Sequence, residues 1–483
     1  MYKRIILPIL LLIGATALFP SAPPATEVRA VWLATNYGLD WPHNHTSVEE
    51  QKRELTAILD NLKAHNFNTV IFQVRGRGEV CYHSQIEPMS TFIAPSGLRF
   101  PTFDPLAFVV EECHTRGLEC HAWVVTYPLG KDQHVRSLGA RSVTKRNPSI
   151  TRQFRGEWFL DPGDPQTDDY LLQLVREIVA GYDVDGIHFD YIRYPEQGEN
   201  FPDDGTYYLY GGGKPRQEWR RDNITRFVTK AYDRVKALKP WVQVSSAPLG
   251  RYRALNGNDE GWTALESVSQ DAGKWLMTGK HDAVYPMMYY KEDLFYPYVD
   301  DWLEHANGRI VTPGLGAFRM IELEWSRSDI LNQVDYTRRR DTHGQAYFRA
   351  ENLLSDTDGI LMALRPYYGF PAKLPPMTWL NSSPPDSPQD LRAETNEEGI
   401  FELFWEKDNR ERITYNVYRS ETDTLSLDNA EKLIAAGLRQ PLYTSRVEAN
   451  DKAYYYYITA SDAYHNESRP CIPAFFYHSH TVK

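Results

Sequence analysis

Short apolar runs alternate with longer amphipathic stretches through most of the chain. The runs are rich in β-branched and aromatic residues, which favours buried parallel strands. The stretches between them place apolar residues three and four positions apart, as helices that cover a sheet do. The expected strands are Val28–Ala34, Thr69–Val74, Leu118–Val125, Gly186–Asp190, Val242–Ser246, Ala283–Met287, Ile310–Leu315 and Gln345–Arg349. The expected helices are Ser47–His65, Asp104–Arg116, Thr167–Tyr182, Glu218–Leu238, Ala264–Thr278 and Ser328–Arg340.

This alternation predicts an α/β fold, either a closed (β/α)₈ TIM barrel or an open doubly wound sheet. No glycine-rich dinucleotide fingerprint follows the first run, which disfavours the open sheet. We therefore expect a barrel over residues 27–380.

The pattern changes after residue 380. Residues 381–388, NSSPPDSP, are a linker by composition, since Pro and Ser oppose both helix and sheet. Alternating strands follow, and they predict a small all-β, immunoglobulin-like sandwich over residues 389–483. This tail resembles a fibronectin type III domain. The resemblance is carried by Pro388, Leu391, Trp405, Tyr415–Arg419, Tyr457–Ala460 and Asn466–Ser468.

The N-terminal residues 1–25 are typical of an export signal. Lys3 and Arg4 precede an apolar stretch, Ile5–Phe19, and small residues and prolines follow it. No cysteine closes the segment, so a lipid anchor is not expected. The prediction is a periplasmic or extracellular protein, with an uncleaved N-terminal anchor as the alternative.

Charge and composition limit the classes of molecule that the protein is expected to bind. The net charge of −11 argues against nucleic acid and anionic membranes but is compatible with a neutral or amino-sugar polymer. The aromatic content of 13% either supplies rings that stack on sugars or packs the core. The four cysteines are scattered and form no zinc-binding CxxC pair, so we expect buried free thiols, no metal and no cofactor.

Polar residues follow the expected strands at their carboxyl ends, where barrel enzymes carry their reactive groups. They are Asn36, Arg75, Glu79, Tyr127, Asp190, Arg193 and Tyr289, while Gln73, His121 and Trp123 are candidates to point inward from within strands.

The strongest local feature is the segment Tyr182–Pro195, in which a buried strand ends in Asp190 and Arg193 follows at once. A carboxylate beside a cation is kept ionised. Such a group suits a nucleophile, a base, or a stabiliser of an oxocarbenium-like centre. The alternative is an Asp–Arg pair that braces a loop.

Glycoside hydrolysis also needs a second, protonated carboxyl group. Glu79 is the first choice, because its glycine-rich loop can bring it inward. Asp161 is the second, although its Asp-Pro-Gly sequence is also a common turn. Asp271 is the third, and Asp40 is a candidate to line the cleft.

His121 and His188 have two readings: contacts to a sugar or to Asp190, or satisfied histidines of the barrel core. A metal site is the least favoured reading. Trp123, Tyr127, Tyr191 and Tyr289 are candidates for sugar stacking, with core packing as the alternative.

Residues from about Glu27 to Pro376 resemble the bacterial glycosyl-hydrolase-like 10 proteins, a group that includes divisome-associated hydrolases of peptidoglycan glycan strands. The matching segments are Glu27–Ala34, Phe72–Arg75, Leu118–Trp123, Leu160–Gly163, Val184–Asp190 and Ala283–Tyr289. The resemblance implies a (β/α)₈ barrel, glycosidase activity and Asp190 as the fourth-strand carboxylate. This chain departs from the family pattern at Glu79, where Asp is usual, and at Tyr191, where a second acidic residue is common.

Two functional hypotheses follow. The first is an exported monomeric glycoside hydrolase with Asp190 and Glu79 as catalytic residues and peptidoglycan glycan as the preferred polysaccharide. Its expected substrate contacts are Asn36, Gln73, Arg75, His121, Trp123, Asp161, His188, Arg193 and Tyr289. The second is a non-catalytic glycan-binding protein. In both, the C-terminal domain is a candidate to contact protein or glycan.

Overall fold

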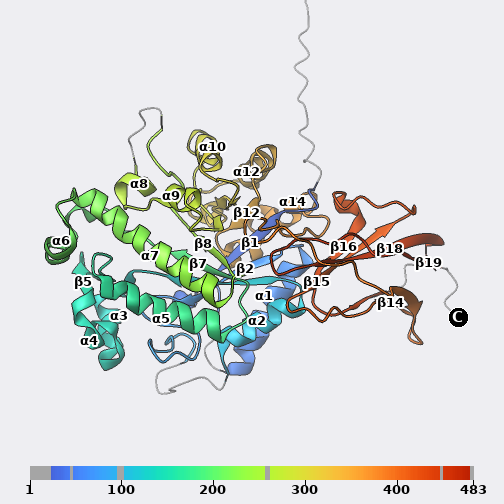
Figure 1. Ribbon diagram of the computed structural model, residues 1–483, viewed down its shortest axis with the longest axis horizontal. Coiled ribbons are helices and arrows are strands. Elements are labelled where there is room, and N and C mark those ends of the chain that lie inside the picture. The colour runs from blue at the N-terminus through green and yellow to red at the C-terminus, as the bar shows by residue number, and fades with distance from the viewer. Residues whose placement is uncertain (1–22, 44–46, 95–102, 256–260, 447–449, 479–483) are drawn as a thin grey trace, which may run out of the picture.

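The computed structural model describes residues 23–43, 47–94, 103–255, 261–446 and 450–478. A single parallel sheet forms its centre, in the order β10-β9-β8-β7-β3-β2-β1-β12-β11 (Figure 1). Its strands are β1 (Val28–Leu33), β2 (Thr69–Arg75), β3 (Glu119–Val125), β7 (Gly186–Asp190), β8 (Gln243–Ser246), β9 (Ala283–Val284), β10 (Ile310–Val311), β11 (Gly314–Leu315) and β12 (Gly344–Tyr347). Every expected barrel strand is present.

The sheet closes on itself, because β10 and β11 are the two halves of one strand interrupted at Pro313. On one side of this strand, the Thr312 N–H donates to Val284 O at 3.0 Å. On the other side, the Ala346 N–H donates to Pro313 O at 3.0 Å. With β10 and β11 joined, the strands form the predicted eight-stranded barrel.

Helices surround the barrel, as expected for apolar stretches that cover a parallel sheet. The longer ones are α1 (Val48–Ala64), α2 (Pro105–Thr115), α5 (Pro165–Gly181), α7 (Arg216–Leu238), α10 (Tyr296–Glu304) and α12 (Arg327–Arg339). The short ones after the later strands are α8 (Ala264–Ser267), α9 (Ala272–Met277), α11 (Arg319–Glu322), α13 (Ala350–Leu354) and α14 (Ile360–Leu364). The stretch expected as one helix over 264–278 is two, α8 and α9, and α10, α11, α13 and α14 were not predicted.

Two insertions enlarge the carboxyl side of the barrel. After β3 the chain forms a small antiparallel sheet in the order β4-β6-β5. It consists of β4 (Pro128–Lys131), β5 (Thr151–Phe154) and β6 (Glu157–Leu160), accompanied by α3 (Asp132–Ser137) and α4 (Val143–Arg146). After β7 comes the second insertion, with helix α6 (Asp204–Tyr210). The sequence pattern predicted neither insertion.

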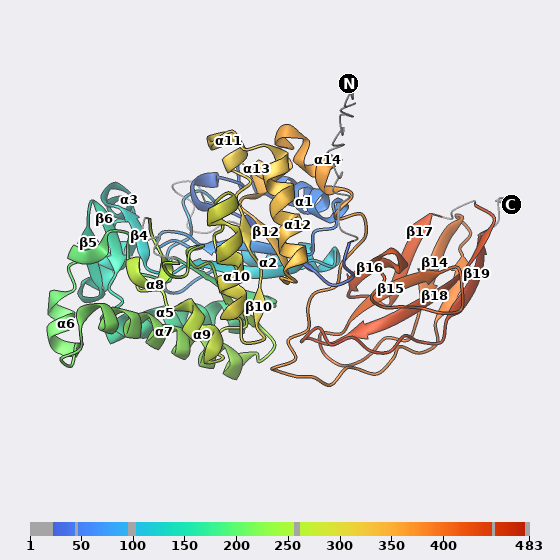
Figure 2. The ribbon, with the colours of Figure 1, turned by 90° about the horizontal axis from the view of Figure 1, so that it is seen from above.

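Beyond the linker, a three-stranded sheet, β13-β14-β17, faces a four-stranded sheet, β16-β15-β18-β19. Phe401 and Leu403 of the first sheet share a core with Val417 and Ile458 of the second, which makes this part an all-β sandwich. Its strands are β13 (Arg392–Thr395), β14 (Ile400–Phe404), β15 (Thr414–Ser420), β16 (Leu433–Leu438), β17 (Leu442–Arg446), β18 (Lys452–Ser461) and β19 (Ala474–His478). The sandwich and the β4-β6-β5 sheet lie on opposite sides of the barrel (Figures 1 and 2).

Most of the expected export signal, residues 1–22, lies outside the described residues. No helix within the described ranges is long and apolar enough to cross a membrane. The prediction of buried free thiols is confirmed, since Cys81, Cys113, Cys120 and Cys471 are all buried and unpaired.

Candidate functional site

Asp190 is the last residue of β7, at the carboxyl end of the barrel. Its Oδ1 accepts a hydrogen bond from the backbone N–H of Tyr191 at 2.7 Å. Its Oδ2 accepts one from Nε1 of Trp123, on the neighbouring strand β3, at 3.1 Å. The carboxyl group is therefore oriented from two sides, and Trp123 acts on it directly.

Burial raises the pKa of Asp190 to about 6, although Arg193 and the two hydrogen bonds lower it. From the sequence we expected Arg193 to keep this carboxyl ionised with ease. The pKa of Asp190 is instead raised, because the loss of hydration on burial outweighs the effect of a single nearby cation. Asp190 can exchange a proton close to neutral pH, as an acid, a base or a nucleophile that turns over there must.

The side chains of Arg193, Tyr191 and Tyr289 lie around Asp190. The Arg193 guanidinium lies 4.7 Å from the centre of the Tyr191 ring and pairs with Glu196 at 2.6 Å. The Nε of Arg193 is buried and has no hydrogen-bond partner among the described residues. Burial and the nearby Asp190 raise the pKa of Tyr289 well above its ordinary value. Arg193 and Tyr289 are thus placed at the mouth, as expected.

Glu79 lies in the loop after β2. It is buried, its Oε1 accepts a hydrogen bond from the Thr91 N–H at 3.0 Å, and its Oε2 is 3.7 Å from Nε2 of His134. Burial raises the pKa of Glu79 to about 7. A carboxyl group that keeps its proton up to neutral pH has the property required of a general acid. Glu79 and Asp190 are held by different partners, so each is positioned independently.

Gln73 and Asn36 lie together at the ends of β2 and β1. The side-chain Oε1 of Gln73 accepts hydrogen bonds from the backbone N–H groups of Thr35 at 3.0 Å and Asn36 at 2.8 Å. Gln73 therefore fixes the loop after β1. Asn36 is half-buried and its side chain faces Gly76, at the rim of the barrel mouth.

Two predicted substrate contacts are instead structural. Arg75 is fully buried and forms a bidentate pair with Glu87, at 2.7 and 2.6 Å, and also donates to Thr126 O at 3.0 Å. Asp161 is fully buried, accepts from the Gly163 N–H at 2.8 Å and pairs with Arg152 at 2.9 Å. We correct both assignments: Arg75 braces β2 against β3, and Asp161 stabilises the Asp-Pro-Gly turn.

Both histidines also belong to the barrel interior. His188 accepts a hydrogen bond at Nε2 from Trp32 Nε1 at 3.2 Å, which places its proton on Nδ1, 2.9 Å from Ser245 Oγ. Burial lowers the pKa of His188 well below its ordinary value, so it stays neutral. His121 is buried and its Nε2 lies 2.9 Å from Glu119, at the amino end of β3 and away from Asp190. Neither histidine reaches the mouth, so their assignment as substrate contacts is corrected.

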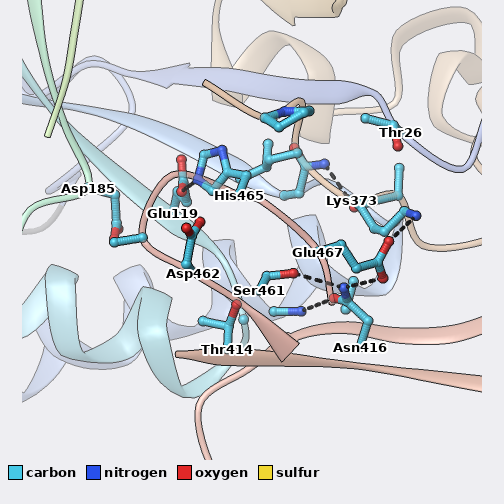
Figure 3. Close-up of a pocket in the computed structure, with 18 of the residues that line it drawn as sticks. Thr26, Glu119, Asp185, Lys373, Thr414, Asn416, Ser461, Asp462, His465 and Glu467 are labelled. Carbon is cyan, nitrogen blue, oxygen red and sulfur yellow. Dashed lines mark hydrogen bonds and ion pairs between the residues drawn. The ribbon is translucent and has the colours of Figure 1, made fainter. Parts of the chain in front are cut away.

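At the opposite end of the strands, a cavity of about 380 Å³ separates the barrel from the sandwich. Asp185, Glu119 and His465 lie at one end of it, and Lys373 with Glu467 at the other (Figure 3). His465 of the sandwich is 2.6 Å from Glu119 of the barrel, and Lys373 Nζ is 2.6 Å from Glu467. The walls of this cavity are thus fixed by ion pairs between the two parts of the chain.

No group of three or more His, Cys, Asp and Glu side chains in the described parts of the chain is arranged as a metal site. One mouth residue was missed by the sequence reasoning. Tyr37, in the Asn-Tyr-Gly turn after β1, has 47% of its surface exposed. An aromatic residue in a tight turn directly after a barrel strand is the signal that could have found it.

Comparison of the sequence with known proteins finds a family model and several curated relatives, among them one from Bacillus subtilis and one from Escherichia coli. The family model described as glycosyl hydrolase-like 10 matches residues 27–305. The glycosyl hydrolase YngK of Bacillus subtilis is 28% identical over 477 residues, which covers 92% of this chain and 92% of that protein. The glycosyl hydrolase DigH of Escherichia coli is 33% identical over 301 residues, covering 56% of this chain and 68% of that protein.

Solved structures similar to this chain at low sequence identity include two from Paenibacillus. An α-L-fucosidase of Paenibacillus thiaminolyticus is 13% identical, with a TM-score of 0.48, and covers 71% of this chain and 49% of its own. The catalytic domain of a β-amylase from Paenibacillus polymyxa is 12% identical, also with a TM-score of 0.48, and covers 72% of this chain and 98% of its own.

Proposed function

The chain belongs to the glycosyl hydrolase-like 10 family, and from that premise we propose that it is an exported glycoside hydrolase that cleaves a polysaccharide, with peptidoglycan glycan strands as its preferred substrate. The observation that carries the proposal is Asp190, a buried carboxyl group at the carboxyl end of β7 whose pKa is raised to about 6. In (β/α)₈ enzymes, this end of the barrel carries the reacting groups.

The two carboxyl groups divide the chemistry by their protonation. Between pH of about 6 and about 7, Asp190 is largely ionised while Glu79 is largely protonated. Glu79 then donates a proton to the departing sugar oxygen, and Asp190 acts on the anomeric centre as nucleophile or as base for water. Because glycosidases use two carboxyl groups in this way, the pair accounts for hydrolysis without a cofactor.

The substrate is proposed from the family resemblance and from the export signal expected over residues 1–25. A negatively charged protein, at −11, suits a neutral or amino-sugar polymer better than an acidic one. Peptidoglycan glycan is proposed because an exported bacterial protein encounters it and its backbone consists of N-acetylated amino sugars.

The experiment is a digest of purified peptidoglycan, both intact and stripped of its peptides, read by mass spectrometry. The wild type should release glycan fragments, and Asp190→Asn should release them about 10³-fold more slowly. Melting temperatures of both proteins control for folding. Cleavage by Asp190→Asn at the wild-type rate would remove Asp190 from the centre of the reaction.

A non-catalytic glycan-binding protein is the second candidate. The observation that favours it is that Glu79 and Asp190 share no hydrogen-bond partner among the described residues, so no network ties them into one catalytic unit. Glycan binding by the wild type with no product released from either digest would select this candidate.

A further inference from the structure

Two tyrosines at the barrel mouth have exposed rings. Tyr37 follows β1 and exposes 47% of its surface, and Tyr191 follows β7 and exposes 36%. A flat aromatic ring that is open to solvent can cover the apolar face of a sugar, as buried aromatic rings in the core cannot.

Each ring is held in a defined orientation. Phe92 packs edge-on against Tyr37, with the ring centres 5.6 Å apart and the planes at 87°. The Arg193 guanidinium lies 4.7 Å from the centre of the Tyr191 ring. A ring fixed before the ligand arrives loses less conformational entropy on binding than a mobile one does.

Both tyrosines also adopt a backbone conformation that is unfavourable for bulky residues. Their φ angles are 59° for Tyr37 and 48° for Tyr191, in the left-handed region that favours glycine. Residues held in this region are strained, and they cluster at ligand-binding sites, where the backbone conformation sets the direction of the side chain. A glycine would relieve this strain at either position but would supply no ring.

Each tyrosine is connected, through its neighbours, to one of the two carboxyl groups, Asp190 or Glu79. Tyr191 directly follows Asp190, and its backbone N–H donates to that carboxyl. Phe92, which packs on Tyr37, directly follows Thr91, whose N–H donates to Glu79. Around the barrel, β1 and β7 are separated by β2 and β3, which puts three strand spacings, roughly 14 Å along the sheet, between the two rings' strands. The two rings are therefore attached to different sides of the mouth.

We propose that Tyr37 and Tyr191 are stacking platforms for the two sugar units that flank the bond to be cleaved, Tyr191 on the Asp190 side and Tyr37 on the Glu79 side. The inference rests on the proposed glycan-directed function and adds to it the residues that set the position of the chain. Glycan contact through these rings requires neither the peptides of peptidoglycan nor a charge on the sugar.

The test uses full-length protein and peptide-free glycan strands, with oligosaccharides of defined length prepared from them. Tyr37→Ala and Tyr191→Ala should each lower kcat/KM about tenfold, whereas Tyr37→Phe and Tyr191→Phe, which keep the ring, should stay within about twofold of wild type. Tyr208→Ala is the matched control, since Tyr208 is a tyrosine 89% exposed on the distant helix α6. It should leave kcat/KM unchanged.

The same substitutions are then made in Asp190→Asn and measured by equilibrium binding of the oligosaccharides, which separates the platforms from catalysis. Each alanine variant should bind about tenfold more weakly, with an unchanged melting temperature. If wild type cleaves or binds glycan and neither alanine variant is impaired, or if the phenylalanine variants are impaired equally, the platform assignment is wrong while the proposed function stands. If wild type neither cleaves nor binds glycan, the proposed function fails and the platforms fail with it.

Discussion

Strand β7 has a buried carboxyl group at each end, and the two groups have different kinds of partners. Asp185, just before the strand, lies 2.9 Å from His114 Nε2 and 3.0 Å from Arg439 Nη2, and it also pairs with Arg412. Asp190, at the other end, receives only two N–H groups as direct partners among the described residues.

The pKa values follow from these partners. Burial alone would raise the pKa of Asp185, but His114, Arg412 and Arg439 outweigh it and hold the pKa well below its ordinary value. At Asp190 burial prevails, and the pKa rises to about 6. A buried carboxylate with its charge compensated is part of the structure, whereas one with its charge left uncompensated is available for proton chemistry.

The difference also separates the two faces of the barrel. The cations that compensate Asp185 include Arg412 and Arg439 of the sandwich, so the amino face is a docking surface inside the molecule. The described part of the sandwich packs at the amino ends of the strands. The opposite, carboxyl face is the one on which we propose that the substrate binds.

Asp185→Asn gives the largest expected loss of stability. Removing the charge leaves two arginines and a histidine without their buried anion, which should lower the free energy of unfolding by about 3–5 kcal/mol. Urea unfolding measures the loss. Asp183→Asn is the control, because Asp183 pairs with the same three side chains but is itself 52% exposed; it should cost less than about 1 kcal/mol. Equal losses for the two variants would contradict the comparison.

The stability of Asp190→Asn relative to wild type should depend on pH in the direction opposite to that of Asp185→Asn. A carboxyl group whose pKa is raised on folding holds its proton more tightly in the folded state, so wild-type stability falls as the pH rises from about 4 to about 6. Asparagine lacks this loss, and its stability relative to wild type should improve by about 3 kcal/mol over that range. For Asp185→Asn, the deficit should instead shrink as the pH falls below the ordinary value of 3.8. Unfolding curves at several pH values measure both effects. If the stabilities of the two variants change in parallel with pH, the difference between Asp185 and Asp190 is contradicted.

Glu79→Gln should lower kcat/KM about 10²-fold and change its pH profile. In the wild type, the proposed activity should rise as Asp190 ionises near pH 6 and fall as Glu79 loses its proton near pH 7. Glutamine cannot lose that proton, so the alkaline limb should vanish while the acidic limb remains. Glu157→Gln is the control and should keep both limbs; Glu157 lies in β6, 3.6 Å from Arg77 of the loop that carries Glu79. An alkaline limb that survives in Glu79→Gln would assign the acid to another group.

Trp123→Phe is expected to have the smallest effect. It removes the N–H that bonds to Asp190 Oδ2, so the pKa of Asp190 should rise further. The acidic limb of kcat/KM should move upward, with a loss of about tenfold near pH 6. Trp32→Phe removes an indole N–H from the same barrel interior but from His188 rather than Asp190. An identical shift in both variants would indicate general loosening of the barrel rather than positioning of Asp190.

The sequence by itself determined the barrel and the place of its central carboxyl group. Hydrophobic period and strand length are local properties, and they located all eight strands, most of the flanking helices and Asp190 at a strand end. The β4-β6-β5 sheet was not predicted: its four-residue strands are partly exposed, whereas the barrel strands β8 and β12, of the same length, are buried throughout.

Only the tertiary structure decided what each polar residue does. Arg75 pairs with Glu87 across a loop. Asp161 is hydrogen-bonded to Thr206, 45 residues away, and His188 to Ser245, 57 residues away. The same holds for the partners of Asp185 and Asp190, which lie five residues apart, just before β7 and at its end. Their difference arises because a charge is compensated by neighbours in space, and those neighbours come together only when the barrel closes and the sandwich docks.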